Sequence, residues 1–310
     1  MTYLVTGGAG FIGSNIVKEL LTRGEKVRVL DNFATGKREN ILLYKDDPNL
    51  QIIEGDLRSF HIVRDAVKGC DFVLHQGALP SVPRSVNDPI TSNDVNILGT
   101  LNILEAAKEF KVKRVVFASS SSVYGNAATL PKEESMAVAP LSPYAVSKYA
   151  AERYCQIYYQ LYGLETVCLR YFNVFGPNQD PTSQYSAVIP KFIKSIQAGR
   201  QPVIYGDGTQ SRDFTFVTNN VTANLLACTA EGVAGEVFNI ACGVKYTLNE
   251  LVDEINKVLG TDIHPLYDKD RTGDVKHSLA DISKARQGLD YQVQVEFAEG
   301  IRRTVEFFTR

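Results

Sequence analysis

The chain has 310 residues, of which 44% are hydrophobic and 22% charged, a composition that indicates a globular protein and excludes a disordered or collagen-like chain. Its formal net charge of −2 favours neither a nucleic acid nor an anionic membrane as a partner. The five cysteines include no Cys-x-x-Cys pair, which indicates no metal site. The chain also has no apolar run of the ~20 residues that span a bilayer and no signal-peptide pattern. We therefore predict a cytoplasmic protein with no membrane segment.

Short apolar runs alternate with helical patterns along most of the chain. The patterns predict strands at residues 3–5, 26–30, 51–53, 71–75, 114–118 and 166–170, and helices at 11–22, 59–68, 94–110, 143–162, 187–198 and 248–259. Strands that alternate with helices form a parallel sheet covered by helices on both faces. The predicted fold class is therefore α/β, a doubly wound parallel sheet of the Rossmann type with a smaller C-terminal α/β lobe. We expect the sheet domain to cover residues 1–170, with residues 213–240 returning to it, and the lobe to lie mainly in 171–310.

The loop after the first predicted strand is rich in glycine. Gly7, Gly10 and Gly13 follow the strand and open a helix. In this context the first glycine permits a tight turn, the second lets the backbone approach a pyrophosphate, and the third lets the helix lie close to the strand. The N-terminus of the helix also favours phosphate charge. The loop therefore predicts a dinucleotide site, with Phe11 and Ile12 in the segment that faces the cofactor.

An acidic residue ends the second predicted strand. Asp31 lies 18 residues beyond the last glycine of the loop. A carboxylate there accepts a hydrogen bond from a ribose 2′-hydroxyl and repels the 2′-phosphate of NADP. NAD is therefore the expected cofactor, with Asn32 as a further polar contact, although Arg28 and Lys37 are close enough in sequence to hold a phosphate.

A tyrosine and a lysine stand four residues apart in the helix expected at 143–162. On a helix Tyr144 and Lys148 share one face. A lysine ammonium beside a phenol lowers the phenol pKa, so Tyr144 could carry a proton near neutral pH while Lys148 also holds a ribose. A run of four serines, residues 119–122, follows the strand at 114–118. Hydroxyl groups at the carboxyl end of such a strand face the ligand crevice.

These motifs together resemble the extended short-chain dehydrogenase/reductase family over essentially the whole chain, and within it the UDP-N-acetylglucosamine (UDP-hexose) 4-epimerases. The matching segments are the three glycines, Asp31, Asp56-Leu57, the serines before residues 123–125, Tyr144 with Lys148, and residues 170–177. The resemblance implies Ser120, Tyr144 and Lys148 as the catalytic residues. It implies a cofactor set that adds, to the glycine loop and Asp31, the residues Asn32, Asp56, Leu57, Gln76, Ala78, Asn96, Tyr144, Lys148 and Tyr171. On the residues alone, Asp56 could equally be an acceptor for adenine or a turn residue.

The resemblance also implies a UDP-sugar site. Two arginines can neutralise a diphosphate through charge-assisted hydrogen bonds. The nucleotide set implied is Asn173, Ala187, Val188, Lys191, Tyr205, Arg212, Arg271 and Asp274, and the sugar set is Ser81, Arg84, Ser120, Ser121, Ser122 and Ser278. Ser278 stands at the position where a bulky tyrosine leaves room only for a plain hexose, whereas a small residue admits an N-acetyl group.

We therefore expect reversible C4 epimerisation of UDP-N-acetylglucosamine and UDP-N-acetylgalactosamine, with UDP-glucose and UDP-galactose as weaker substrates and NAD bound throughout. A UDP-glucuronate 4-epimerase or decarboxylase is the alternative, with Arg84 facing the carboxylate. A 4,6-dehydratase would usually have Thr-Asp-Glu in place of the serine run, and a non-catalytic NAD sensor often lacks the tyrosine or the lysine. Gly77, Thr218 and the pair Leu79-Pro80 depart from the family pattern.

The resemblance further implies a homodimer. Its interface would be a four-helix bundle built from the helices at 94–110 and 143–162 of each copy. Tyr154, Tyr158 and Tyr162 on the second helix could be aromatic anchors of that interface or residues of the core.

Overall fold

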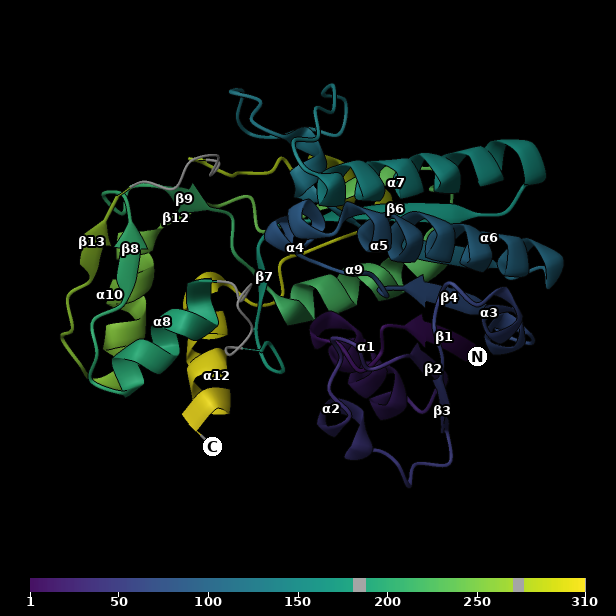
Figure 1. The fold of residues 1–310 in the computed structure, drawn as a ribbon, viewed down its shortest axis with the longest axis horizontal. Coiled ribbons are helices and arrows are strands. Elements are labelled where there is room, and N and C mark those ends of the chain that lie inside the picture. Colours follow the sequence, from purple (N-terminus) through teal and green to yellow (C-terminus); the bar gives the residue numbers. More distant parts are fainter. Residues whose placement is uncertain (181–187, 270–275, 310) are drawn as a thin grey trace.

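The computed structural model describes residues 1–180, 188–269 and 276–309. A seven-stranded sheet forms its larger part, with strand order β11-β6-β5-β4-β1-β2-β3 and every neighbouring pair parallel (Figure 1). This sheet confirms the predicted fold class. Its strands are β1 (Thr2–Thr6), β2 (Lys26–Asp31), β3 (Leu50–Glu54), β4 (Phe72–His75), β5 (Arg114–Ser120), β6 (Thr166–Tyr171) and β11 (Val237–Ile240).

Helices cover both faces of the sheet and bury its apolar side chains in two clusters. One face carries α3 (Phe60–Val67), α6 (Gly99–Glu109) and α7 (Pro143–Tyr162), and the other carries α1 (Phe11–Thr22) and α9 (Val217–Thr229). The ends of α7 are set by local sequence. The Ser142 hydroxyl accepts a hydrogen bond from the Ala145 N–H with Pro143 in the first turn, and Gly163 ends the helix in the left-handed conformation.

The order of the strands reverses between β1 and β4. From β1 the chain runs outward through β2 and β3, and then returns to place β4 on the other side of β1. Loops leaving the carboxyl ends of two such strands turn in opposite directions, which opens a crevice between them. Short elements lie in the connections on this side: α2 (Glu39–Leu42), α4 (Val82–Asn87), α5 (Pro89–Asn93) and a 3-10 turn, η2 (Ser121–Tyr124).

A smaller lobe lies beside the carboxyl edge of the sheet (Figure 1). The chain enters it through β7 (Val174–Phe175), which pairs with β10 (Thr215–Phe216), and it leaves and re-enters the lobe around α9 and β11. Its elements are α8 (Val188–Gln197), β8 (Val203–Tyr205), β9 (Ser211–Arg212), β12 (Tyr246–Thr247), α10 (Leu248–Leu259), β13 (Leu266–Asp268) and α12 (Phe297–Thr309), while α11 (Ser283–Leu289) lies against β11.

The single helix predicted at 94–110 is wrong in its first part. A π-helical turn, η1 (Asp94–Leu98), precedes α6, and α5 extends the helical region back to Pro89. The sequence patterns also missed α9 as an element. Buried residues lie on several of its faces because it is covered by the sheet, α1 and α11, so the sequence lacks the one-sided apolar stripe by which helices are recognised.

Candidate functional site

The glycine loop forms a backbone cradle at the end of β1. Gly7 has φ +64°, and a Cβ atom on Gly13 would lie 2.1 Å from the Gly7 carbonyl oxygen, so only glycine allows α1 to approach this turn so closely. A Cβ on Gly10 would lie 3.1 Å from the same oxygen. The N-terminus of α1 therefore fits a dinucleotide pyrophosphate, because no side-chain cap occupies the N–H groups of its first turn.

The crevice is a cleft of ≈ 620 Å³ that runs from the cradle to α7. It gathers residues from α1, β2, β5, β6 and α7 and from the loops that follow β1 and β4. Among the predicted site residues, those that line it are Gly7, Gly10, Phe11, Ile12, Gly13, Asp31, Asn32, Asp56, Leu57, Gln76, Ala78, Ser81, Arg84, Tyr144, Lys148 and Tyr171.

Asp31 is a buried carboxylate on the cleft wall. Its Oδ2 atom accepts a hydrogen bond from the Ala9 N–H at 2.9 Å, and Oδ1 accepts one from the Phe33 N–H at 2.8 Å. Burial raises the pKa of Asp31, and the two backbone hydrogen bonds oppose this rise. Each oxygen keeps a further lone pair. The carboxylate can therefore still accept a hydrogen bond from a hydroxyl group, and it would repel a phosphate.

Asp56 lies in an ion pair at the cleft. Arg58 Nη2 lies 2.7 Å from its Oδ2 atom, and the Asn32 amide donates to the same oxygen at 3.0 Å. The Arg58 hydrogen bond lowers the pKa of Asp56 to about 2. The carboxylate thus has a structural partner, and its role toward adenine stays a prediction.

Tyr144 and Lys148 lie one turn apart on α7, opposite the end of β5. The Tyr144 hydroxyl is hydrogen-bonded to Ser120, and the buried Lys148 ammonium donates to the Ala118 carbonyl at 2.7 Å. The expectation that Lys148 lowers the phenol pKa is not confirmed, since Ser120 and not Lys148 is the group that lowers it. Burial raises the pKa of Tyr144, and the Ser120 hydrogen bond is the opposing influence. Burial also lowers the pKa of Lys148, to about 8, and its ammonium is already bonded to a carbonyl.

The Ser120 hydroxyl is oriented by its neighbour Ser122. Its oxygen accepts the Ser122 N–H at 3.2 Å and the Ser122 hydroxyl at 2.9 Å. A hydroxyl has two acceptor positions and one proton. With both acceptor positions occupied, the Ser120 proton is directed to the Tyr144 oxygen, where it stabilises a phenolate.

The segment after β4 forms the third wall of the cleft. Asn96 lies behind this wall, fully buried, and exchanges hydrogen bonds with Leu79 while donating to the Ser147 hydroxyl at 2.9 Å. Asn96 therefore supports this wall from behind and is not among the residues that line the cleft. Ser81 has φ 103°, an unusual value for a non-glycine residue, and its hydroxyl accepts the Arg84 N–H at 3.3 Å. Backbone strain of this kind often occurs at ligand sites.

The nucleotide set is brought together only in part. Asn173 donates its amide to the Ser278 hydroxyl at 3.5 Å, and Arg212 donates to the carbonyls of Ser211 and Lys276 at 2.9 and 3.2 Å. These three predicted residues therefore adjoin one another around β9. Val188 and Lys191 lie on α8, Tyr205 ends β8, and Ser121 and Ser122 lie in η2. The predictions for Ala187, Arg271 and Asp274 fall outside the described residues.

A segment that the sequence patterns did not assign to the site, residues 178–180, also borders the cleft. Lys37 forms an ion pair with Asp180 at 3.2 Å, and the Asn178 amide donates to the Ser14 hydroxyl on α1 at 2.9 Å. Lys37, Asn178 and Asp180 all line the cleft. The partners are far apart in sequence, and a Gly/Pro-rich loop around residue 177 was the only signal.

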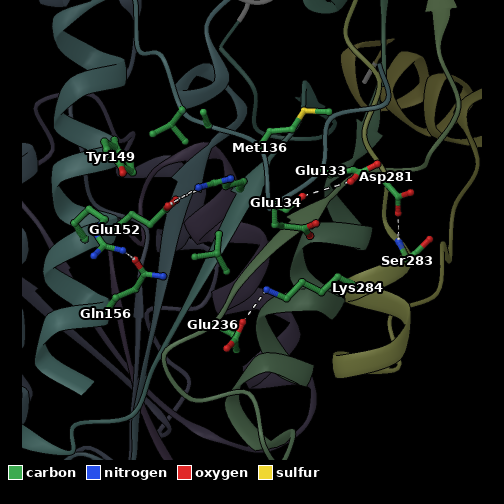
Figure 2. Close-up of a pocket in the computed structure, with 16 residues that line it drawn as sticks. Glu133, Glu134, Met136, Tyr149, Glu152, Gln156, Glu236, Asp281, Ser283 and Lys284 are labelled. Carbon is green, nitrogen blue, oxygen red and sulfur yellow. Dashed lines mark hydrogen bonds and ion pairs between the residues drawn. The ribbon is translucent and has the colours of Figure 1, made fainter. Parts of the chain in front are cut away.

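A second hollow, of ≈ 750 Å³, lies between α7, the segment 133–138 and α11. Figure 2 shows its carboxylates and the ion pair between Lys284 and Glu236 at 2.7 Å. None of the predicted site residues lines it. The described residues also contain no group of three or more His, Cys, Asp or Glu that could hold a metal ion, and no described helix is long and apolar enough to cross a membrane.

Comparison with known proteins gives matches along the chain. Residues 3–241 match the NAD dependent epimerase/dehydratase family. A putative UDP-glucose 4-epimerase of Methanocaldococcus jannaschii is 40% identical over 306 residues, covering 98% of this chain and 97% of that protein. The solved UDP-N-acetylglucosamine 4-epimerase of Methanobrevibacter ruminantium M1, in complex with UDP-N-acetylmuramic acid, is 44% identical with a TM-score of 0.95 and covers 99% of this chain and 98% of its own. The Thermus thermophilus UDP-glucose 4-epimerase in complex with NAD is 38% identical with a TM-score of 0.89, over 100% and 99% of the two chains.

Proposed function

Because this chain belongs to the NAD-dependent epimerase/dehydratase family, we propose that it reversibly epimerises C4 of UDP-N-acetylglucosamine and UDP-N-acetylgalactosamine. The family, the NAD cofactor and the enzyme class expected from sequence are confirmed. The observation that carries the proposal is the group of Ser120, Tyr144 and Lys148: Tyr144 and Lys148 line the cleft, and Ser120 is hydrogen-bonded to Tyr144.

In the proposed reaction the Tyr144 phenolate takes the proton of the C4 hydroxyl. Ser120 stabilises the phenolate by donating a hydrogen bond to it. Lys148 is within reach of a ribose that occupies the cleft, and its charge then favours the phenolate. The glycine loop and Asp31 would hold NAD, which would supply a hydride acceptor and donor for C4, so that the reaction consumes no oxidant. The 4-keto sugar turns about its diphosphate between loss and return of the C4 hydrogen, while Tyr144 keeps the proton that it later returns.

The sugar preference rests on the small side chains near the proposed sugar position. Ser278 is a small, half-buried residue beside Asn173, and Ser81 and Arg84 line the cleft on the side of α4. A serine leaves space that an N-acetyl group can fill, so we propose UDP-glucose and UDP-galactose as weaker substrates. The charge of Arg84 makes UDP-glucuronate the competing substrate.

A coupled epimerase assay tests the proposal. The purified chain is offered UDP-N-acetylglucosamine, UDP-glucose and UDP-glucuronate, and the cofactor released on denaturation is identified. We expect NAD in near-stoichiometric amount and the highest kcat/KM with the N-acetylated sugar. A higher kcat/KM with UDP-glucuronate would favour the alternative, and no turnover of any UDP-sugar would contradict the proposed function.

Removing the Ser120 hydroxyl should change the pH dependence of turnover. Ser120→Ala deletes the hydrogen bond that lowers the Tyr144 pKa, so this pKa rises further. Tyr144 must be deprotonated to accept the C4 proton, and the acidic limb of kcat therefore moves to higher pH. At neutral pH we expect kcat to fall about 100-fold, the usual effect of removing one stabilising donor. A pH–rate profile of the variant that keeps the wild-type acidic limb would contradict this role.

We also propose a homodimer formed through α6, α7 and the short helices before them. Apolar side chains on this surface are exposed in the single chain, including Ile90 at 74%, Val146 at 49% and Leu161 at 69%. Of the three expected aromatic anchors, Tyr158 belongs to the core, 7% exposed, whereas Tyr162 is 53% exposed. Exposed apolar and aromatic side chains such as these are typical of the buried centre of an interface.

Charges on this surface should separate the proposed dimer. In the double variant Val146→Glu and Leu161→Glu, two carboxylates would lose their hydration in the interface, which is unfavourable. Sedimentation velocity should show a dimer for the wild type and a monomer for the variant. Leu43→Glu, at a residue 82% exposed beside α2, is the matched control and should remain dimeric. A monomeric wild type, or a dimeric double variant, would exclude this interface.

A further inference from the structure

A buried ion pair lies behind the proposed catalytic residues. Glu152 on α7 and Arg170 on β6 are 1% and 3% exposed. Arg170 Nη2 lies 2.6 Å from Oε1 of Glu152, and Arg170 Nε donates to Oε2 at 3.0 Å. Figure 2 shows Glu152 reaching from α7 into the wall of the second hollow, which Arg170 also lines.

A further partner of Glu152 connects the pair to β5. The Ser119 hydroxyl donates to Oε2 of Glu152 at 2.8 Å. Ser119 and Arg170 are also direct neighbours in the sheet, since they are partners in the register of β5 and β6. Glu152 therefore joins α7, β5 and the neighbouring strand β6 at a single carboxylate.

Three residues of α7 thereby fix the end of β5. Tyr144, Lys148 and Glu152 are spaced by four residues and share one face of the helix. Tyr144 is bonded to Ser120, Lys148 to the Ala118 carbonyl, and Glu152 to the Ser119 hydroxyl between them. Three consecutive residues of β5 are thus each hydrogen-bonded to one residue on this face of α7.

The buried ion pair is not needed merely to hold α7 against β6. Removing both charges from water opposes folding, and well-packed apolar residues of similar volume are often as stabilising. Arg170 Nη1 is buried without a hydrogen-bond partner, so this desolvation is not fully compensated. Apolar side chains could not, however, accept the hydrogen bond that the Ser119 hydroxyl donates.

We propose that Glu152, oriented by Arg170, is a positioning residue for the epimerisation, because it holds Ser119 and thereby sets the distance from Ser120 to Tyr144. The proposal rests on the proposed function of Ser120 and Tyr144. Glu152 does not line the cleft and exchanges no proton with the sugar; it acts through Ser119, which borders the cleft. Since a displacement of the order of 1 Å in a reacting group can lower a rate about 100-fold, a partial loosening should reduce kcat measurably.

The first test is a double-mutant cycle on kcat. Ser119→Ala removes the donated hydroxyl and keeps the ion pair, whereas Glu152→Gln removes the charged acceptor. We expect each to lower kcat about 10-fold, with KM for the UDP-sugar and the NAD content unchanged. Because both act through one bond, the double variant should be no slower than the slower single variant. Two independent, multiplying losses, or a wild-type kcat in Ser119→Ala, would overturn the proposal.

A matched control separates this effect from the general loss of a buried hydroxyl. Thr304 on α12 is fully buried, and its hydroxyl donates to the Gly300 carbonyl. Thr304→Val should leave kcat at the wild-type value. A loss of kcat in Thr304→Val equal to that in Ser119→Ala would assign the effect to stability and overturn the proposal.

The second test needs no sugar and no turnover. The tyrosinate absorbance of Tyr144 is obtained by subtracting the pH titration of the Tyr144→Phe variant from that of the intact protein. In Ser119→Ala we expect the midpoint of this titration at higher pH, because a loosened Ser120 stabilises the phenolate less. An unchanged midpoint would contradict the positioning role whatever the substrate, whereas a wild type inactive on every UDP-sugar would contradict the proposed function alone. Since Glu152→Gln leaves a buried charge without its partner and can unfold the chain, Ser119→Ala decides this test.

Discussion

Replacing Tyr144 with phenylalanine lowers kcat by a factor of between about 100 and 10,000, the range in which a positioned proton carrier contributes. The substitution removes one oxygen atom and keeps the ring on α7 that borders the cleft. Without that oxygen the C4 hydroxyl has no base, while Lys148 and the glycine cradle stay in place. The NAD released from the denatured variant should therefore match the wild type in amount.

A second tyrosine on the same helix provides the control for this experiment. Tyr159 is 39% exposed and lies three turns beyond the cleft residues of α7. Tyr159→Phe removes the same atom from the same element and should leave kcat unchanged. Near-normal turnover in Tyr144→Phe would refute its role as base, and equal losses in both variants would show that α7 merely tolerates no change.

Replacing Ser278 with tyrosine should remove the activity on N-acetylated sugars and spare that on plain hexoses. The tyrosine ring would occupy the space beside Asn173 that we assign to the N-acetyl group. Overfilling a well-packed site typically costs about 1–3 kcal/mol, which corresponds to a fall in kcat/KM of about 5- to 150-fold.

Comparing substrates within this one variant makes the measurement specific. UDP-glucose has no N-acetyl group to exclude, so its kcat/KM should stay within a few-fold of the wild type. Ser283→Tyr, on the exposed start of α11, is a control for the addition of a tyrosine and should change neither activity. Continued epimerisation of UDP-N-acetylglucosamine by Ser278→Tyr at the wild-type rate would remove Ser278 as the determinant of sugar size.

The parts of the molecule that could be predicted from sequence are those with local causes. The predicted bounds of α1, α7 and α10 coincide with the structure, because apolar spacing and terminal residues such as Ser142 and Gly163 act within one helix. The glycine cradle was equally predictable, since a positive φ at Gly7 and the close approach at Gly13 require that residue type. The prediction of the cofactor half of the site rests on these local signals.

The remaining features depend on partners that lie far apart in the chain. Lys37 meets Asp180 only after the strands have been ordered, and Glu152 meets Arg170 only once α7 lies on β6. The rise in the Tyr144 pKa has the same origin, since burial of the phenol follows from tertiary structure and cannot be read from its neighbours in sequence. Sequence spacing correctly suggested that Tyr144 and Lys148 share a helix face, but it gave the wrong partner for the lysine ammonium.

The position of β11 at the edge of the sheet affects how the protein forms during synthesis. The outer edge of β6 is completed only by β11, which the ribosome makes roughly 70 residues after β6 ends. Until then β6 presents unpaired backbone groups, a template for association with other chains. A nascent chain that stops near residue 170 thus holds most of the cofactor residues, yet it has an open sheet edge that invites aggregation. Completion of the first half of this enzyme therefore waits for translation of much of the second.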